Sequence, residues 1–294
     1  MKALDERIMD FVNENPVDEK LKYRIQKPMY KFFGENIYRQ GLTALLSGKN
    51  LLLIGEKSTG KNVLAENLAY TLSRPLYNIS FHVNTDASAL IGTDTLIDGK
   101  VVFREGPIYM CAKYGGLGVL DEINMAKNEA LAVLHSTLDY RRIIDVPGYD
   151  KIKLHKAARF IATMNYGYLG TRDLNEALLS RFVVIKMPSP DQKLLEDIFS
   201  NIFPNLKKSV NIQITSLFLD LKKKFEAGEI SDSSVDLRGM INSVDLVQNG
   251  LNVKEAFSMG IVSRCMDDYE QTLVKDLVST RFSEDLCYDD LFEA

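Results

Sequence analysis

The most constraining feature of this chain of 294 residues is a glycine-rich turn that follows an apolar segment and precedes a helical one. The apolar segment spans residues 51–54, and helical periodicity resumes at Val63 and continues to Leu72. Between them lies the turn Gly55-Glu56-Lys57-Ser58-Thr59-Gly60-Lys61-Asn62. Because glycine tolerates backbone conformations that other residues rarely adopt, such a turn can curl tightly. The sequence therefore predicts a strand, a tight turn and a helix whose first N–H groups face that turn.

The spacing of this turn is that of a P-loop, Gly-x-x-x-x-Gly-Lys-Ser/Thr, with one departure. In a P-loop, backbone N–H groups and the helix N-terminus surround phosphates, while the lysine, here Lys61, reaches the outer ones. We therefore predict that residues 55–63 bind a nucleotide. The departure is Asn62, which stands where a hydroxyl normally binds magnesium. Its amide oxygen is also a hard ligand, but its greater length moves the metal or inserts a water. The substitution weakens the inference to hydrolysis more than the inference to nucleotide binding.

Short apolar runs alternate with helical patterns from Asn50 onward, which is typical of β-α units and a parallel sheet. Buried strands are predicted at residues 51–54, 76–81, 118–120, 160–164 and 182–186. Two hairpins, at residues 93–104 and 141–154, interrupt the alternation, with Asp98-Gly99 and Pro147-Gly148 at their turns. The predicted fold class is α/β, a P-loop NTPase three-layer αβα sandwich with a five-stranded parallel sheet.

A stiff link, Pro188-Ser189-Pro190, marks a change in texture. Beyond it the periodicity is helical, at residues 214–225, 237–248 and 256–267, with Gly228, Gly250 and Gly260 as breaks. We therefore predict a small C-terminal α-helical lid domain. The expected organisation is an N-terminal helical lead-in (1–35), an α/β nucleotide-binding domain (36–187) and the lid (188–294).

The charge balance disfavours some functions. The chain carries 36 Lys and Arg against 40 Asp and Glu, a net charge of −4, so it has no global attraction for nucleic acid or anionic lipid. No apolar stretch reaches the length of a membrane span, and charges interrupt the first ten residues where a signal peptide needs an apolar core. A cytoplasmic protein without direct nucleic-acid binding is expected. The three widely spaced cysteines favour free thiols over a disulfide or a zinc site.

An acidic pair, Asp121-Glu122, ends the apolar run at residues 118–120. Chemistry in a parallel sheet gathers at the carboxyl ends of its strands. Asp121 can hold magnesium directly or through water, and Glu122 can orient and deprotonate the water that attacks a γ-phosphate. Many strands end in an acidic turn, so the pair is weak evidence alone. Combined with the P-loop it predicts phosphoryl transfer.

Four further motifs follow one another along the chain: Gly106-Pro107, Gly116-Leu117-Gly118-Val119-Leu120-Asp121-Glu122-Ile123-Asn124, Ala162-Thr163-Met164-Asn165 and Leu174-Asn175-Glu176-Ala177-Leu178-Leu179-Ser180-Arg181-Phe182. Together they resemble the AAA+ ATPases, within the branch that includes MoxR, the rubisco (CbbQ) and nitric-oxide-reductase activators, and the dynein-related modules. The resemblance covers roughly residues 36–270. Each motif is common alone, but their order is specific.

The resemblance implies further site residues. Asn165 is expected to bond the attacking water or γ-phosphate, and Arg181 to act as an arginine finger on the neighbouring subunit's nucleotide. A planar guanidinium suits the charge that develops on a phosphoryl group. Arg238, at the start of a predicted helix, is the candidate second sensor of the nucleotide. The implied cofactors are ATP and Mg2+, the metal held by Asp121 and Asn62. Arg172 and Asn175 are further interface candidates.

The two predicted hairpins fit insertions of this branch, which in related rings face the pore or a partner. The side chains of Ile97, Val101, Val102 and Phe103 can serve either as core or as an exposed apolar edge. Tyr149, near the turn of the second hairpin, is a candidate substrate contact.

The predicted function is a MoxR-like AAA+ ATPase that forms a ring, commonly a hexamer, and acts as a chaperone-like remodeller or activator of a partner protein. Relatives often act with a protein that carries a von Willebrand A domain. One alternative is a nucleotide-dependent scaffold or switch with little hydrolysis, because Asn62 replaces the P-loop hydroxyl. Another is the motor subunit of a nucleic-acid complex of the restriction type, which the acidic balance disfavours. A small-molecule P-loop kinase would have no use for the segment that ends at Arg181. The client protein and the choice between ATP and GTP stay open.

Overall fold

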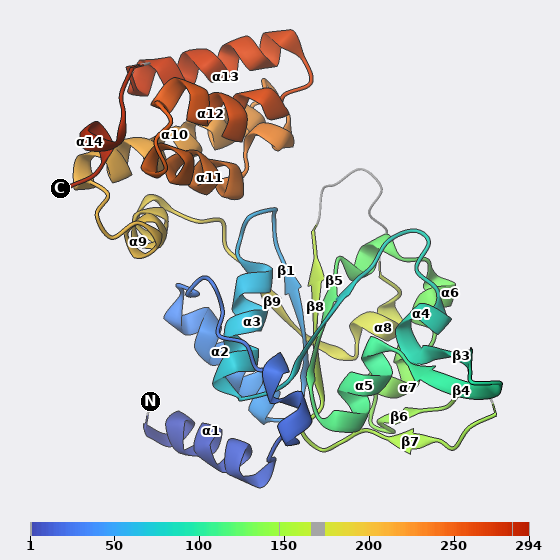
Figure 1. The fold of residues 1–294 in the computed structure, drawn as a ribbon. Helices are drawn as coiled ribbons and strands as arrows, with labels where there is room; N and C mark the ends of the chain where they lie inside the picture. Colours follow the sequence, from blue (N-terminus) through green and yellow to red (C-terminus); the bar gives the residue numbers. More distant parts are fainter. Residues whose placement is uncertain (1, 147, 166–173, 284, 294) are drawn as a thin grey trace. The chain divides into compact units, whose positions relative to one another are not determined.

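The computed structural model describes residues 2–146, 148–165, 174–283 and 285–293, drawn as a ribbon in Figure 1. The chain forms two compact units, Met1–Ser189 and Pro190–Ala294. Within the described ranges, no helix combines the length and apolar character needed to cross a membrane.

The first unit is built on a five-stranded sheet whose paired strands all run parallel. The strands, in the order in which they lie side by side, are β2 (Leu76–Ser80), β5 (Leu117–Asp121), β8 (Arg159–Met164), β1 (Asn50–Ile54) and β9 (Phe182–Lys186). Their bounds differ from the predicted ones by one residue at an end or not at all, apart from β5, which is longer at both ends. The predicted fold class is confirmed.

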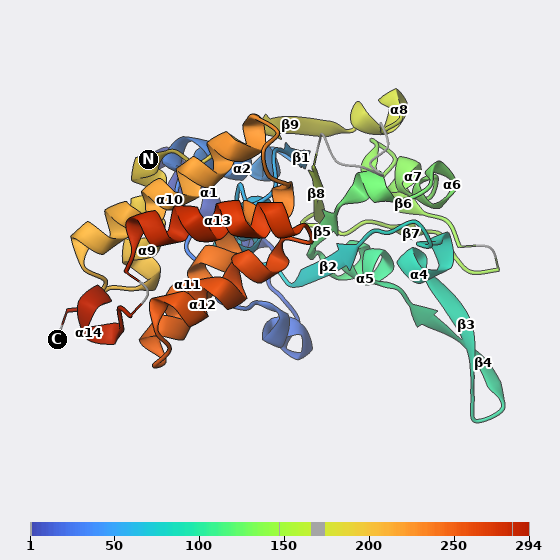
Figure 2. The same ribbon diagram turned by 90° about the horizontal axis from the view of Figure 1, so that it is seen from above.

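Helices cover both faces of this sheet, which makes three layers (Figures 1 and 2). One face carries α1 (Lys2–Glu14), α2 (Glu35–Leu46) and α3 (Lys61–Thr71), and the other carries α4 (Ala87–Ile91), α5 (Pro107–Tyr114), α6 (Asn128–Leu131), α7 (Leu134–Leu138) and α8 (Glu176–Leu179). Side chains alternate between the two faces of a strand. Accordingly, Leu51 and Leu53 pack in the core beneath α2 and α3, whereas Leu52 packs in the opposite core.

Two short antiparallel ribbons decorate the second face. The first joins β3 (Gly92–Ile97) to β4 (Lys100–Glu105), and Figure 2 shows it as a projecting arm. Its turn residues Asp98 and Gly99 both have positive φ, as a two-residue hairpin turn requires. The second pairs β6 (Ile143–Ile144) with β7 (Ile152–Lys153). Both predicted hairpins therefore form, although the second has only two residues in each strand.

The second unit is helical, as predicted. Its helices are α9 (Gln192–Ile202), α10 (Lys208–Glu226), α11 (Leu237–Gln248), α12 (Val253–Gly260), α13 (Asp268–Arg281) and α14 (Tyr288–Leu291). Helices α9, α11, α12 and α13 begin after an Asp or Asn whose side chain accepts a hydrogen bond from a backbone N–H of the first turn. Short 3₁₀ turns lie at Glu19–Arg24 and Ile123–Met125 in the first unit and at Asp232–Ser234 and Val262–Arg264 in the second.

The helical periodicity predicted at residues 256–267 is divided in the structure at Gly260, one of the predicted breaks. Helix α12 ends at Gly260, a 3₁₀ turn follows, and α13 begins only at Asp268. The division coincides with a close contact between α11 and α12, where a methyl group on Gly239 would lie 2.5 Å from the Gly260 carbonyl oxygen. Two glycines on different helices permit this approach.

Candidate active site

The glycine-rich loop connects the carboxyl end of β1 to the start of α3, as the sequence predicts. Gly60 caps the helix with φ of 79°, a conformation that favours glycine. The Lys61 side chain is buried and donates hydrogen bonds to the carbonyl oxygens of Gly55 (3.0 Å) and Glu56 (2.6 Å). The ammonium group is therefore folded over the centre of the loop. Phosphate oxygens, which carry full charge, are stronger acceptors than these carbonyls.

Asp121, the last residue of β5, lies between the loop and β8. Its Oδ1 accepts a hydrogen bond of 2.6 Å from the Thr163 hydroxyl, and its Oδ2 accepts one of 3.0 Å from the Asn62 amide. The register of the sheet explains this meeting, because Leu120 pairs with Ala162 and the next residues on both strands are Asp121 and Thr163. The structure thus brings Asn62 and Asp121, the two predicted magnesium ligands, into contact.

Glu122 has a φ of 54°, which is uncommon for a residue with a side chain. Its backbone N–H donates to the Thr163 hydroxyl at 3.1 Å, and its carboxylate accepts a hydrogen bond of 3.1 Å from the Asn165 amide. Asn124 in turn donates to the Asn165 carbonyl at 3.0 Å. Positive φ at a non-glycine residue persists only where the surroundings fix it, and it is enriched at functional sites. The two residues predicted to handle the attacking water are therefore joined directly.

The donor set around Asp121 suits magnesium. The Asn62 Oδ1 atom is buried and has no hydrogen-bond partner among the residues that the structure describes. An uncompensated buried carbonyl oxygen is costly, and a hard cation would satisfy it. The described parts of the chain hold no group of three or more His, Cys, Asp or Glu residues arranged for a metal. Magnesium here would therefore depend on Asp121, Asn62, water and the phosphates, the mixed ligand set that it commonly takes.

Arg181 lies at the opposite end of the sheet from the P-loop. The register of β1 and β9 pairs Phe182 with Asn50 and Lys186 with Ile54. Arg181 therefore precedes the strand at the end where β1 begins, whereas the loop follows the end where β1 finishes. The strand between them spans about 13 Å at a rise of about 3.3 Å per residue. Arg181 and the P-loop are therefore about a strand length apart.

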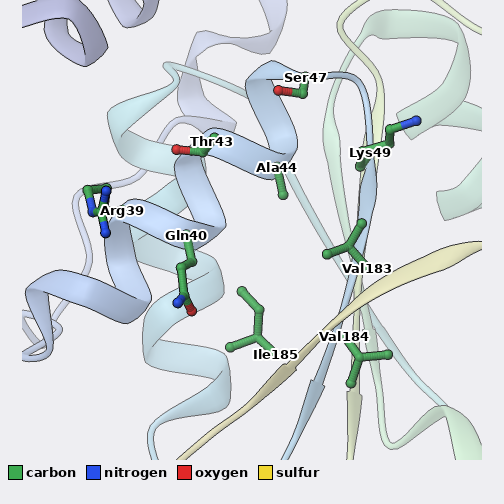
Figure 3. Close-up of a pocket in the computed structure, with 9 residues that line it drawn as sticks. All are labelled: Arg39, Gln40, Thr43, Ala44, Ser47, Lys49, Val183, Val184 and Ile185. Carbon is green, nitrogen blue, oxygen red and sulfur yellow. The ribbon is translucent and has the colours of Figure 1, made fainter.

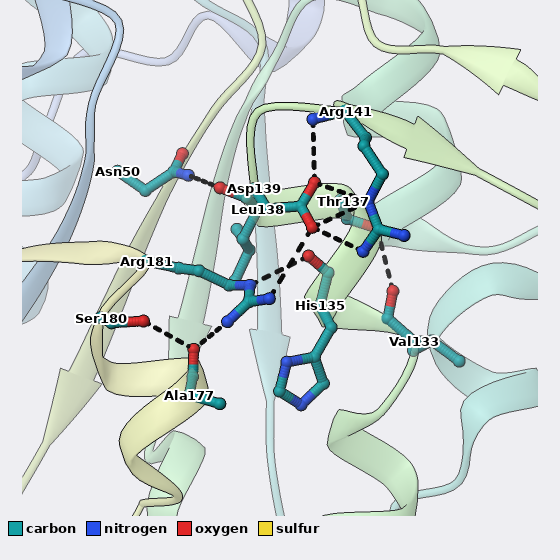
Figure 4. A network of polar contacts seen from close by, with 10 residues as sticks. All are labelled: Asn50, Val133, His135, Thr137, Leu138, Asp139, Arg141, Ala177, Ser180 and Arg181. Atoms are coloured by element: carbon teal, nitrogen blue, oxygen red, sulfur yellow. Dashed lines mark hydrogen bonds and ion pairs between the residues drawn. The ribbon is translucent and has the colours of Figure 1, made fainter.

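Figure 4 shows Arg181 in a network of polar contacts that joins α7, α8 and the segment after α7. Its guanidinium donates to the backbone carbonyls of His135, at 3.1 Å, and Ala177, and lies 3.7 Å from the Asp139 carboxylate. Asp139 also accepts hydrogen bonds from the Arg141 guanidinium, the shortest of 2.6 Å. The hydrogen bonds from Arg141, more than any other cause, lower the pKa of Asp139 from its ordinary value. Burial and then Arg181 lower the pKa of His135, so this imidazole is neutral at pH 7.

Comparison with known proteins places the chain in a family. Residues 50–182 match the AAA domain of the dynein-related subfamily. The chain is also 32% identical over 274 residues to the uncharacterized protein YojN of Bacillus subtilis, which covers 92% of this chain and 90% of YojN. The chain belongs to the AAA+ ATPases.

Two further proteins are similar to this AAA+ ATPase. An uncharacterized protein of Staphylococcus saprophyticus is 33% identical over 256 residues, covering 84% of this chain and 96% of the relative. A crystal structure from Cytophaga hutchinsonii, provisionally described as an ATPase, superposes with a TM-score of 0.50 over 97% of this chain and 91% of that one. Its sequence identity is 16%, so this likeness concerns the fold.

Arg238, the candidate second sensor, lies in the first turn of α11 in the second unit of the AAA+ ATPase. The Asp236 side chain caps this helix by accepting from the Arg238 backbone N–H at 3.2 Å, and it also pairs with Arg264. The Arg238 side chain is exposed, and its guanidinium makes no hydrogen bond or ion pair with any residue of the described ranges. Its predicted contact with nucleotide stays a prediction.

A groove of about 500 Å³ lies between α2 and the outer strand β9 (Figure 3). Its walls include Arg39 and Gln40 on the helix and Val183 and Val184 on the strand. None of its lining residues belongs to the P-loop or the acidic pair. The groove is therefore separate from the predicted nucleotide site.

The hairpin residues divide between exposed and packed positions. Val101 and Val102 are 68% and 43% exposed and Ile97 is 52% exposed, whereas the Phe103 ring packs against those of Tyr109 and Tyr149. The Tyr149 hydroxyl donates to Asp94 at 2.5 Å, so it ties the second hairpin to the first. The Tyr149 side chain is 41% exposed, and its predicted substrate contact stays a prediction.

The remaining interface candidates have separate outcomes. Arg172 lies outside the described residues. Asn175 caps α8, because its side chain accepts from the Ala177 N–H at 2.8 Å.

Sequence reasoning assigned no role to several polar residues of these sites: Thr163, Asn124, Asp139 and Arg141. Thr163 had a usable signal, since it is a polar residue one position before the end of a buried strand whose neighbour ends in Asp121. Asp139 and Arg141 had none. Their link to Arg181 arises only when α7 and α8 pack together.

Proposed function

We propose that this AAA+ ATPase hydrolyses ATP in a ring of its own copies and uses the reaction to remodel or activate a partner protein. The observation that carries the proposal is the split arrangement of its polar groups. Lys61, Asp121, Glu122 and Asn165 gather at the carboxyl ends of three adjacent strands, β1, β5 and β8, whereas Arg181 lies at the amino end of β9. One copy would supply the first set and its neighbour the arginine.

The chain's own residues would divide the reaction as follows. Lys61 and the loop N–H groups bind and orient the phosphates. Glu122 accepts the proton of the attacking water, and the Asn165 amide holds that carboxylate in place while it contacts the water or the γ-phosphate. The neighbour's Arg181 stabilises the charge that develops on the transferred group. Magnesium, held by Asp121 and Asn62, supplies charge neutralisation on the phosphate oxygens when bound.

The finer assignment follows the MoxR-like branch. A hexameric ring, a chaperone-like role in the cytoplasm and a partner with a von Willebrand A domain are proposed on that resemblance. The exposed apolar residues of the β3–β4 hairpin, Leu96, Ile97 and Val101, support a protein client, because an apolar arm in water favours contact with another protein.

The test is phosphate release by purified protein at concentrations that allow association, with Glu122→Gln in parallel. Removing a general base costs about 100-fold to 10,000-fold in rate. We expect wild type to turn over ATP and the variant to bind ATP with little turnover. Equal rates in both proteins would contradict the assigned base.

A second candidate, a nucleotide-dependent switch with little hydrolysis, is favoured by one observation. Both Asp121 carboxylate oxygens already accept hydrogen bonds, one of them from the Asn62 amide that replaces the usual hydroxyl. Magnesium would compete with these donors. If wild type and Glu122→Gln both bind ATP and are equally inactive, the switch is supported and the motor is not.

A further inference from the structure

The cluster around Asp139 contains a second guanidinium that the proposed reaction has not used. Arg141 donates to both carboxylate oxygens of Asp139, from Nε at 3.2 and 3.0 Å and from the terminal nitrogen at 2.6 Å. Its backbone N–H also donates to this carboxylate at 2.9 Å. Arg181, which lies between α8 and β9, reaches the same carboxylate. Figure 4 shows both guanidinium groups converging on Asp139 from two sides.

The charges of this cluster do not cancel. In the described residues, Asp139 is the one carboxylate with which either Arg141 or Arg181 forms an ion pair. Two guanidinium groups therefore share one negative charge, and one positive charge is left over. The neighbouring His135 is neutral and does not change this balance. A cluster with surplus positive charge suits an anionic ligand.

The exposure of the three side chains separates their roles. Arg141 is 48% exposed and Arg181 is 21% exposed, whereas Asp139 is only 10% exposed. The carboxylate thus lies beneath the two arginines and fixes their planes, while the arginines face outward. Guanidinium groups that are already oriented lose less conformational freedom when they bind phosphate oxygens.

We propose that Arg141 is a second catalytic arginine that acts with Arg181 on the neighbouring copy's triphosphate, and that Asp139 is the positioning residue for both. The proposal rests on the trans role of Arg181 in the proposed function. Two planar donors fit the several oxygens of a triphosphate better than one. Each guanidinium has more N–H groups than those that contact Asp139. Arg141 and Arg181 can therefore bind phosphate while Asp139 keeps a partner.

The first test compares ATP turnover of wild type with that of Arg141→Ala, Arg141→Lys and the control Arg39→Ala. Arg39 is an exposed arginine of α2 whose side chain, in the described part of the chain, donates to Asn36 alone. We expect Arg141→Ala to lower kcat roughly tenfold to a hundredfold with little change in KM, since it removes charge-assisted bonds made in the transition state. Lysine should restore part of the rate, and the control should match wild type. Because the Arg141 side chain is half-exposed and Arg181 still contacts Asp139 in the variant, the thermal midpoint should move by no more than about 3 °C. An unchanged kcat would overturn the proposal.

The second test separates action in trans from a structural role. Arg141→Ala subunits are mixed with Glu122→Gln subunits, which keep both arginines but lack the base. Turnover per Arg141→Ala subunit should rise in the mixture, and it should not rise when the added subunits carry Glu122→Gln together with Arg141→Ala. No rise with the first donor would contradict the proposal.

Asp139 is tested by Asp139→Asn, which keeps the shape and removes the charge. We expect a lower kcat at an unchanged KM for ATP; an unchanged kcat would remove Asp139 from the account. Arg181→Ala separates a failure of the proposed function from a failure of the role proposed for Arg141. If Arg181→Ala turns over ATP normally, the trans arrangement of the proposed function fails, whereas an effect of Arg181→Ala without one of Arg141→Ala overturns this inference alone.

Discussion

The two ends of the parallel sheet carry opposite chemistry. At the carboxyl ends, Asn62 donates to Asp121 and Asn165 donates to Glu122. The acceptor oxygen Asn62 Oδ1 remains without a partner in the described residues. At the amino end of β9, Arg181 and its neighbours leave surplus positive charge. The carboxyl ends therefore suit a magnesium nucleotide, and the amino end suits the anionic part of one.

This difference explains why the proposed ATPase site needs two copies of the chain. The strands β1 and β9 are neighbours, yet their parallel register holds Arg181 a full strand length from the P-loop. No side-chain rotation crosses that distance, about 13 Å by the rise of a strand. A second copy would bring the arginine end of one sheet to the phosphate end of another.

The largest expected effect comes from removing Arg181, at the amino end of β9. Arg181→Ala should lower kcat by about 1,000-fold to 100,000-fold, the range found for arginine fingers, while ATP binding is kept. Phosphate release and binding of a fluorescent ATP analogue measure the two quantities. If Arg181→Ala weakened ATP binding by as large a factor as it lowered turnover, the proposed role of Arg181 in the transition state would be contradicted.

Removing the P-loop lysine, at the carboxyl end of β1, should instead weaken ATP binding. Lys61→Ala removes a buried ammonium whose bonds to phosphate are worth about 1.5–3 kcal/mol, so the Kd for ATP should rise about tenfold to 150-fold. Titration with the same analogue gives the Kd, and Lys49→Ala, at an exposed lysine before β1, is the matched control. Equal Kd values for Lys61→Ala and wild type would argue against the P-loop assignment.

A smaller effect is expected at the predicted magnesium site, where a substitution at Asn62 should change the magnesium requirement. Asn62→Ser restores the usual hydroxyl and removes the hydrogen bond to Asp121 Oδ2. We expect half-saturation of turnover at about tenfold lower magnesium concentration, because one charge-assisted bond no longer competes for the carboxylate. A magnesium titration of the rate measures this, and a higher requirement in the variant would show that Asn62 is itself the better ligand.

The smallest effect concerns how His135, beside Arg181, makes the stability of the protein depend on pH. Burial and the nearby arginines lower the pKa of His135, so the unfolded chain takes up its proton first as pH falls from 7.5 to 5.5. The stability that the neutral imidazole contributes is present above about pH 6.5, its ordinary pKa, and is lost below it. Urea unfolding of His135→Gln should therefore show a smaller loss of stability over this range than wild type. His155, whose pKa is also lowered, contributes equally to both proteins, and a steeper loss in the variant would contradict the account.

The P-loop and the acidic pair could be predicted from the sequence because their signals are local in the chain. The strand at residues 51–54, the glycine spacing and Lys61 are contiguous, and Asp121 directly follows an apolar run. The sequence could not show that Thr163 and Asn62 share the Asp121 carboxylate, since that depends on strand order. The motif ending at Arg181 could be found, but the contacts of that arginine could not. They join residues from α7 and α8 that are brought together only by packing. The break at Gly260 could be predicted from the glycine itself, but its close contact with Gly239 on another helix could not.

The central claim is that the two ends of the sheet complete one site between copies. It is tested most directly by phosphate release from a mixture of Glu122→Gln and Arg181→Ala proteins, each almost inactive alone. The account predicts that the mixture regains activity, because a neighbour with Glu122→Gln supplies Arg181 to a site that keeps its base. A mixture no more active than the separate proteins, although both associate, would contradict it.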